Sequence, residues 1–357
     1  MRATPGTEID APRQRLTVEE LREAAVSSNT ADAYKSAIRH YQITCGRLLP
    51  AQPDEICQYL ADHAHLLSVR TLEVRLAALS KWHQVQGLPD PTRTVDVKHV
   101  MKGVRKKFMS PPKKAKPFKI EVIRKIVAHL DAEALQALCE IQHGESRETV
   151  QYRKARRRQL KALRDKALLL VGFWRAFRSD ELSRLVVQNI TAVRGQDIEL
   201  YLTHSKTDRA AKGKAYHMVA LRELCPVSAY LDWIEESGIC EGPVFRKIHH
   251  WGAVAEDGIA SKSIGPVLRD MCESAGIDSE SISTHSMRHG FANWAAKENW
   301  SLPSIMSFVG WASHRNAAGY IRDNHDFGSL SLNSPADRIE GSHSSTVGQT
   351  YLAIPER

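Results

Sequence analysis

The chain has 357 residues, a formal net charge of +9 and a hydrophobic fraction of 42%. At about 150 residues per domain this length predicts two domains. The composition is that of a folded protein, which excludes disorder as the main state. The excess of positive charge favours a polyanionic partner, most simply nucleic acid. Because no run of about 18 apolar residues and no apolar leader occurs, we expect neither a membrane span nor secretion.

The six cysteines are scattered, and none forms a Cys-x-x-Cys pair. They are Cys45, Cys57, Cys139, Cys225, Cys240 and Cys272. Their spacing argues against a disulfide scaffold and against a cysteine zinc site, and it fits a reducing bacterial cytoplasm or nucleoid.

The first half of the chain divides into a polar tail and a helical segment. Residues 1–15 contain two prolines and a glycine and predict a flexible tail. Residues 16–108 show apolar positions three and four apart, which predicts a small all-helical domain. Its helices are expected to start at Thr17, near Asn29 or Thr30, at Pro53, after Ser68 and at Val95, the last one running to about Phe108.

A basic, proline-rich linker follows at residues 109–119. The stretch 103–119 holds three prolines, many lysines and arginines, and no acidic residue. Its prolines forbid a continuous helix. One interpretation is a solvated linker, and the other, which we favour, is a basic strap lying along DNA phosphates. The candidate DNA-binding residues here are Arg105, Lys106, Lys107, Lys113, Lys114 and Lys116.

Residues 120–357 predict a second, mostly helical domain. A hairpin interrupts it at 197–221, where Ile198, Leu200 and Leu202 alternate with polar residues before a turn. A very basic run at 153–166 is either a solvated helix face or a DNA contact. The sequence after about residue 325 is rich in Ser, Asn and Gly and has weak periodicity.

Two arginine motifs suggest chemistry at a phosphate. An apolar helical run, 167–173, precedes Arg175, Arg178 and Arg184, and Glu181 lies three residues after Arg178, so that the two can pair on one helix face. No phosphate-binding loop, no zinc-protease motif and no acidic metal cluster is present. Work on a phosphodiester without a metal needs cationic donors, a proton donor and a protein nucleophile.

The second motif is His285-x-x-Arg288-His289. Histidines four apart on a helix can bind zinc, but Arg288 lies between them on the same face, which opposes a dication. A histidine and an arginine facing one point suit a phosphate. Lys206 lies at the hairpin turn, with Lys212 and Lys214 as competing candidates.

Taken in order, these motifs resemble the tyrosine recombinase (phage integrase) family. Arg178 with Glu181, Lys206 in a hairpin, His285 with Arg288, and Trp311 after Gly310 are followed by a tyrosine at 320. Most family members carry a histidine where Trp311 stands. Tyr351 lacks the Gly-Trp context, so we prefer Tyr320 as nucleophile.

The resemblance implies the fold. It predicts a mainly α protein with an all-helical, SAM-like core-binding domain at 16–108. The catalytic domain at 120–357 would be mixed but mostly α, with a small antiparallel β-sheet, as in the DNA breaking-rejoining enzyme fold.

The resemblance also implies the roles of individual residues. Arg178 and Arg288 would bind the scissile phosphate, with Trp311 as a further donor and Glu181 in support. Lys206 would protonate the leaving oxygen, His285 would take the tyrosine proton, and Tyr320 would form a 3′-phosphotyrosyl link.

Cofactors and partners follow from the same resemblance. No cofactor and no metal are expected. The partner is double-stranded DNA with paired core sites, bound by a homotetramer on two duplexes through a Holliday junction. Two alternatives stay open: a catalytically silent DNA-binding regulator on the same fold, and type IB topoisomerase-like relaxation.

Overall fold

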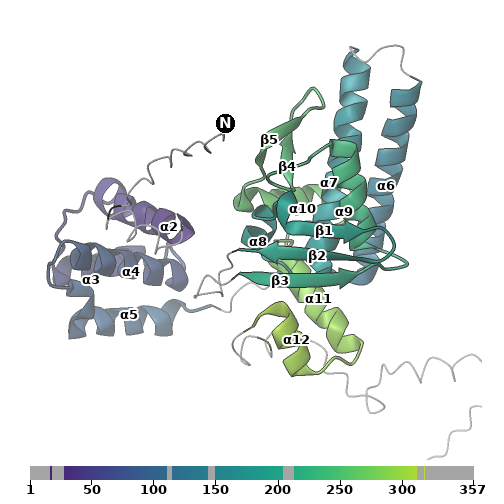
Figure 1. Cartoon of the computed structure of the whole chain (residues 1–357). Coiled ribbons are helices and arrows are strands. Elements are labelled where there is room, and N and C mark those ends of the chain that lie inside the picture. The colour runs from purple at the N-terminus through teal and green to yellow at the C-terminus, as the bar shows by residue number, and fades with distance from the viewer. Residues whose placement is uncertain are drawn as a thin grey trace, which may run out of the picture. The chain divides into compact units, whose positions relative to one another are not determined.

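The protein is described by a computed structural model, which places residue 17, residues 28–110, 115–143, 149–203 and 213–311, and residue 317 (Figure 1). The chain forms two compact units, residues 1–113 and 114–357. Each unit has its own hydrophobic core. None of the described helices is both long and apolar enough to cross a membrane.

The first unit is a bundle of helices in its described part (Figure 1). Its elements are α2 (Ser28–Arg39), the π-helical turn η1 (His40–Thr44), α3 (Pro53–His63), α4 (Val69–Val85), the short 3₁₀ turn η2 (Pro91–Arg93) and α5 (Val95–Phe108). Helix α2 packs on α4, and α3 packs on α5. The core is formed by apolar side chains from these helices, among them Tyr41, Ile56, Tyr59, Leu60, Leu72, Leu79 and Val97.

The predicted starts of three of these helices are confirmed. Helix α3 begins at Pro53, and α5 covers Val95–Phe108. Ser68 caps α4, because its side-chain oxygen accepts the backbone N–H of Thr71 at 3.0 Å. The helix expected from Asn29 or Thr30 begins slightly earlier, at Ser28. Of the helix expected to start at Thr17, the structure describes Thr17 alone, because residues 18–27 lie outside the described residues.

Two long helices form the frame of the second unit. Figure 1 shows α6 (Ile120–Gln142) and α7 (Val150–Trp174) side by side, and α9 (Pro226–Ser237) also packs on α7. Helices α8 (Ser179–Ser183), α10 (Ser261–Ser274), α11 (His285–Lys297) and α12 (Leu302–Val309) complete the described helices of this unit. The apolar run 167–173 at the end of α7 is entirely buried in the core.

A three-stranded antiparallel sheet lies in the second unit. Its order is β1 (Ile190–Val193), β2 (Asp197–Leu202), β3 (Lys214–Val219), with Leu200 opposite Tyr216. The predicted alternation is confirmed, because Ile198, Leu200 and Leu202 are buried on one face. A second hairpin, β4 (Arg246–Ile248) with β5 (Val254–Gly258), was not expected from the sequence.

Five of the eight cations in the basic run 153–166 pair with carboxylates of the second unit, and the other three, Arg153, Lys154 and Arg157, are exposed. The carboxylates belong to α6, α9, α10 and α7 itself. The pairs are Arg156–Glu236, Arg158–Glu133, Arg158–Glu140, Lys161–Asp165, Lys161–Asp270, Arg164–Asp165 and Lys166–Asp131. These contacts give the paired cations a structural role and leave the DNA-contact interpretation open for the three exposed ones.

The end of the predicted linker is docked onto the second unit. The backbone N–H of Phe118 donates to the carbonyl of Ser286 at 3.0 Å, and the Phe118 ring is buried. Lys116 lies 3.4 Å from the carboxylate of Asp278. The fold therefore supplies a counter-charge for Lys116. The extended segment 115–119 runs close along α11, where Gly290 leaves room for the Phe118 backbone.

Candidate active site

The site begins at a tight turn that ends α7. The N–H of Phe177 donates to the carbonyl of Gly172 at 3.0 Å, and the N–H of Ala176 donates to that of Phe173 at 2.9 Å. This is the Schellman arrangement, in which the residue after the helix cap adopts a left-handed conformation. That residue is Ala176, with φ of 52°, where glycine is the usual choice. The turn places Arg178 directly before α8.

Glu181 holds Arg178 in place. One oxygen of its carboxylate accepts the backbone N–H of Arg178 and the other accepts Nη1 of the same residue, each at 2.8 Å. The ion pair expected from the three-residue spacing is therefore present. The side chain of Glu181 is 4% exposed and that of Arg178 is 22% exposed, so the guanidinium keeps one side open. Glu181 also complements the positive end of the short helix α8.

Arg288 is fixed more firmly than Arg178. It lies in the first turn of α11, and its residue exposure is 4%. Its Nη1 donates to the carbonyl of Ala176, and its Nη2 donates to the carbonyl of Val309 at 2.8 Å. Arg288 therefore joins the end of α7 to the end of α12, and Glu181 lies 4.0 Å away. Hydrogen bonds to these carbonyls orient the guanidinium without neutralising its charge.

Arg175 is a third buried cation at the same place. Its guanidinium carbon lies 3.9 Å from the Phe308 ring centroid and 4.7 Å from that of Tyr216. Its Nε has no hydrogen-bond partner among the described residues. Burial lowers the pKa of Arg175 from its usual value, yet an arginine stays charged at neutral pH. The sequence placed Arg175 among the cationic candidates but did not predict that it packs between two rings.

These three arginines line one small cavity, here called the arginine pocket. The described residues around it are Arg175, Phe177, Arg178, Glu181, Lys214, Tyr216, Arg288, Phe308, Val309 and Gly310. Four cationic side chains thus face one carboxylate, an arrangement that attracts an anion. Arg184, the remaining arginine of the motif, pairs with Asp180 instead and does not line the pocket.

Lys214 and Tyr216 come to the pocket from strand β3. Lys214 was one of three lysines considered around the hairpin turn, and it is the one whose position the structure describes. Lys206 and Lys212 lie outside the described residues. Tyr216 was not singled out from the sequence, although its burial followed from the strand alternation. Burial, and to a lesser extent the nearby carboxylate of Glu181, raises the pKa of Tyr216.

Of the other predicted catalytic residues, the structure describes His285 and Trp311 but not Tyr320. His285 is exposed at the first position of α11, and its backbone N–H donates to Ser283 Oγ at 3.2 Å. Trp311 is half-buried directly after Gly310, whose left-handed φ of 75° ends α12. His289, which was not among the predicted catalytic residues, is buried, and its Nδ1 lies 3.2 Å from the carbonyl oxygen of Ala115. Tyr320 lies outside the described residues.

The candidate DNA-binding residues are placed in part. In the first unit, Arg105 pairs with Glu73 at 2.9 Å, and Lys106 and Lys107 are exposed in the last turn of α5. In the second unit, Lys116 pairs with Asp278, with both side chains more than half exposed. Exposed pairs of this kind contribute about 0–1 kcal/mol and exchange readily for a phosphate. Lys113 and Lys114 lie outside the described residues.

Comparisons with a family model and with known proteins all point to one family. Residues 141–326, more than half of the chain, match the model of the phage integrase family. An integrase/recombinase xerD homolog of Selenomonas ruminantium is 26% identical over 331 residues, covering 90% of this chain and 89% of that protein. Recombinase cre of Escherichia phage P1 is 23% identical over 317 residues, covering 84% and 85%.

Solved structures show the same fold. The XerH site-specific recombinase in a post-cleavage complex with difH DNA has a TM-score of 0.53 at 13% identity, covering 87% of this chain and 83% of that one. A lambda integrase dimer bound to a core site has a TM-score of 0.53 at 14% identity, covering 88% and 77%.

The chain therefore belongs to the phage integrase family, and the predicted resemblance to the tyrosine recombinases is confirmed. The predicted fold class, mostly α with a small antiparallel sheet, is confirmed as well. The protein is an enzyme of the tyrosine-type site-specific DNA recombinase class.

Proposed function

We propose that the protein cuts DNA strands at specific sites and rejoins them to new partners through a covalent link to Tyr320. The observation that carries this proposal is the arginine pocket, in which Arg178 and Arg288 are held by Glu181 and by backbone carbonyls. Family membership supplies the reaction class. The pocket supplies the means of holding a phosphate.

The pocket suits the transition state of phosphoryl transfer. The pentavalent phosphorus carries extra charge on its non-bridging oxygens, and fixed cationic donors stabilise that charge. Because Arg288 is already bound to two carbonyls, its position costs no reorganisation when the charge develops. Each such donor is typically worth about a hundred- to a thousandfold in rate. Trp311 can add one N–H donor but cannot transfer a proton as a histidine can.

The cleavage step balances without a cofactor. The Tyr320 oxygen bonds to the phosphorus and the bond to the 5′-oxygen breaks, leaving a 3′-phosphotyrosyl link and a 5′-hydroxyl. His285 takes the phenol proton, and a lysine gives a proton to the departing oxygen. The free phenol has a pKa of about 10, and the cations of the pocket favour its phenolate. A 5′-hydroxyl from another strand reverses the step and joins the new partner.

Exchange between two duplexes requires two sites held together. We propose a homotetramer on two DNA duplexes with paired core sites, passing through a Holliday junction in the bacterial cytoplasm or nucleoid. The biological outcome would be integration of a mobile element or resolution of a plasmid. The DNA partner in this proposal is supported by two solved structures, XerH bound to difH substrate and a lambda integrase dimer bound to a core site.

A plasmid assay separates this function from its alternatives. The protein is incubated, without divalent metal, with a supercoiled plasmid carrying two copies of the DNA that flanks its gene. Site-specific recombination produces deletion or inversion products that need both copies. Relaxation of a plasmid lacking these copies would indicate topoisomerase-like activity instead. Tight binding without any strand breakage on the flanking DNA or on a random-sequence library would indicate a regulator.

The proton donor is tested with a modified substrate. A sulfur in place of the 5′ bridging oxygen leaves without a proton, so it rescues a variant that lacks the proton donor. We expect Lys206→Ala to cleave normal DNA slowly and the sulfur-substituted DNA at the wild-type rate. Lys214→Ala is the matched comparison, because Lys214 lines the pocket. If the sulfur-substituted DNA rescues Lys214→Ala but not Lys206→Ala, the proton donor is Lys214.

A further inference from the structure

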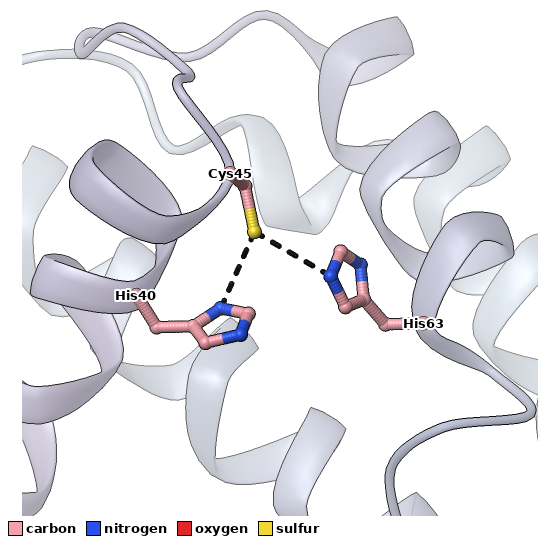
Figure 2. A group of neighbouring side chains, drawn as sticks. All are labelled: His40, Cys45 and His63. Atoms are coloured by element: carbon pink, nitrogen blue, oxygen red, sulfur yellow. Dashed lines mark hydrogen bonds between the residues drawn. The ribbon is translucent and has the colours of Figure 1, made fainter.

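A second cluster of chemically active side chains lies in the first unit and includes no residue of the arginine pocket. His40, Cys45 and His63 point their ligand atoms toward one another (Figure 2). The Cys45 sulfur lies 3.4 Å from Nδ1 of His40 and 3.4 Å from Nε2 of His63. All three ligand atoms lie within 4.8 Å of one another, and all three residues are half-buried.

We propose that His40, Cys45 and His63 form a zinc-binding site. The proposal concerns Zn²⁺ because thiolate and imidazole are the ligands that this ion takes in proteins, whereas Mg²⁺ and Ca²⁺ prefer oxygen. Zinc–sulfur and zinc–nitrogen bonds of about 2.3 and 2.0 Å at a tetrahedral angle separate the two ligand atoms by about 3.5 Å. The two observed sulfur–nitrogen distances match this separation.

The π-helical turn η1 is what brings His40 and Cys45 together. The N–H of Cys45 donates to the carbonyl of His40 at 3.0 Å, a bond across five residues. In an α-helix, residues five apart point about 140° away from each other, since each residue advances by about 100°. The wider π turn removes most of this divergence. Such turns are rare and occur frequently at functional sites.

His63 is oriented as metal-bound histidines are. It lies in the last turn of α3, and its Nδ1 donates to the carbonyl of Tyr59 at 2.9 Å. This bond places the proton on Nδ1 and leaves the Nε2 lone pair facing Cys45. A carbonyl that fixes the tautomer from behind is the usual partner of a metal-bound imidazole.

Arg75 is the competitor for the site. Its Nη1 lies 2.7 Å from Nδ1 of His40 and 2.9 Å from the hydroxyl of Tyr59. The guanidinium therefore covers the His40 lone pair that zinc would use, and its charge opposes a dication. The hydroxyl of Tyr59 also lies 3.2 Å from Nδ1 of His40, so zinc would have to displace both groups from this nitrogen. The Arg75 side chain is long and flexible, which allows it to move aside. Zinc binding would release Arg75 from His40 and link η1 to α3.

Three protein ligands leave a fourth tetrahedral position. Among the described residues, no further His, Cys, Asp or Glu belongs to the cluster. We assign this position to water. A site of this kind does not enter the cleavage step, which takes place in the second unit. It would act on the first unit by bracing the end of α2 against α3.

Cobalt(II) tests the site because its spectrum reports the ligands. Metal-free full-length protein is titrated with Co²⁺, and a sulfur-to-cobalt charge-transfer band with strong visible bands is expected at one equivalent. Zn²⁺ should displace the cobalt and bleach both bands. The charge-transfer band requires a thiolate, so binding at His285 and His289 cannot produce it.

Variants locate the site and control for misfolding. Cys45→Ser should abolish the charge-transfer band, while Cys240→Ser, at an exposed cysteine, should retain it. Losing an outer partner of a metal ligand weakens binding about 10- to 100-fold, so His63→Gln should weaken Zn²⁺ at least about 100-fold. Arg75→Met removes the competing charge and should tighten Zn²⁺ binding. Circular dichroism confirms that each variant is folded.

The result that overturns the proposal is equally specific. A wild-type protein without the charge-transfer band, or a band that persists in Cys45→Ser, rules out this site. Alkylation gives a second readout on the unmodified chain: Zn²⁺ should protect Cys45 and leave the exposed Cys139 and Cys240 reactive. Equal alkylation of Cys45 with and without Zn²⁺ would also contradict the proposal.

Discussion

The arginine pocket of the second unit and the His40–Cys45–His63 cluster of the first are built in opposite ways. In the pocket, carbonyls and a carboxylate occupy one side of the guanidinium groups, and N–H donors face the cavity. In the cluster, a carbonyl holds the proton of His63 on the far nitrogen, and the Nε2 lone pair of His63 faces the Cys45 sulfur. The groups behind Arg178 and Arg288 thus leave donors for an anion, whereas the carbonyl behind His63 leaves a lone pair for the proposed cation.

The largest effect is expected from removing the fixed arginine. Arg288→Ala should slow cleavage about a hundred- to a thousandfold, or about 2.7–4 kcal/mol, because an oriented donor to the transition state is lost. DNA binding should change little. Single-turnover cleavage and gel-shift assays measure the two separately. Arg184→Ala is the control, since Arg184 pairs with Asp180 outside the pocket. Equal losses of cleavage rate in Arg288→Ala and Arg184→Ala would show that Arg288 is not a particular donor to the transition state.

The next largest effect, a loss of stability, is expected from a substitution at Gly290. At this residue, segment 115–119 passes close to α11, the helix that carries Arg288. A methyl group at position 290 would collide with the carbonyl oxygen of Phe118 and meet its N at 3.0 Å. Gly290→Ala should therefore lower the free energy of unfolding by about 1–3 kcal/mol, as overpacking does. Thermal unfolding measures this change.

The matched control for that substitution lies in the first unit. Gly103 in α5 has no atom within 4 Å of the position that a Cβ would take. Gly103→Ala should raise stability by up to about 1 kcal/mol through helix propensity alone. A stabilising Gly290→Ala would show that the segment does not dock on α11.

A smaller effect is expected from the residue that positions Arg178. Glu181→Gln keeps an acceptor for the backbone N–H but loses the charge that holds the guanidinium. We expect cleavage to fall about tenfold, which equals about 1.4 kcal/mol. Glu181→Ala should cost more, because the N–H of Arg178 would lose its acceptor. If Glu181→Gln cleaves at the wild-type rate, the pair does not position Arg178.

No effect on cleavage is expected from metal removal. The pocket works through arginine donors, and the proposed zinc site lies in the other unit. Protein stripped by a chelator should cleave prebound DNA at an unchanged rate, while its first unit unfolds at a lower temperature. Loss of cleavage that Mg²⁺ restores would place a metal in the chemistry.

Much of the fold follows from local rules that the sequence displays. Ser68 before an apolar periodic segment predicts the start of α4, and alternation at Ile198, Leu200 and Leu202 predicts β2. The second hairpin, β4–β5, was missed because its strands are short and their pairing is irregular. Local patterning carries little information about so short a pair.

The two polar sites differ in how far the sequence reveals them. Arg178 and Glu181 are three residues apart on one helical turn, so their pairing can be predicted from spacing. The contact of Arg288 with Ala176 joins residues 112 apart, and no sequence pattern predicted it. The family resemblance only placed Arg178 and Arg288 at one phosphate. His40 and Cys45 are five apart, which an α-helical pattern places on different faces. The π turn that unites them has no sequence signal of its own.

The covalent intermediate is the most direct test of the central claim. Wild-type protein and Tyr320→Phe are incubated with the DNA that flanks the gene, denatured, and analysed for protein–DNA adducts by gel and by peptide mass spectrometry. The account predicts an adduct in the wild type alone, with the DNA 3′-phosphate on Tyr320. An adduct that persists in Tyr320→Phe, or that maps to another residue such as Tyr351, would contradict it.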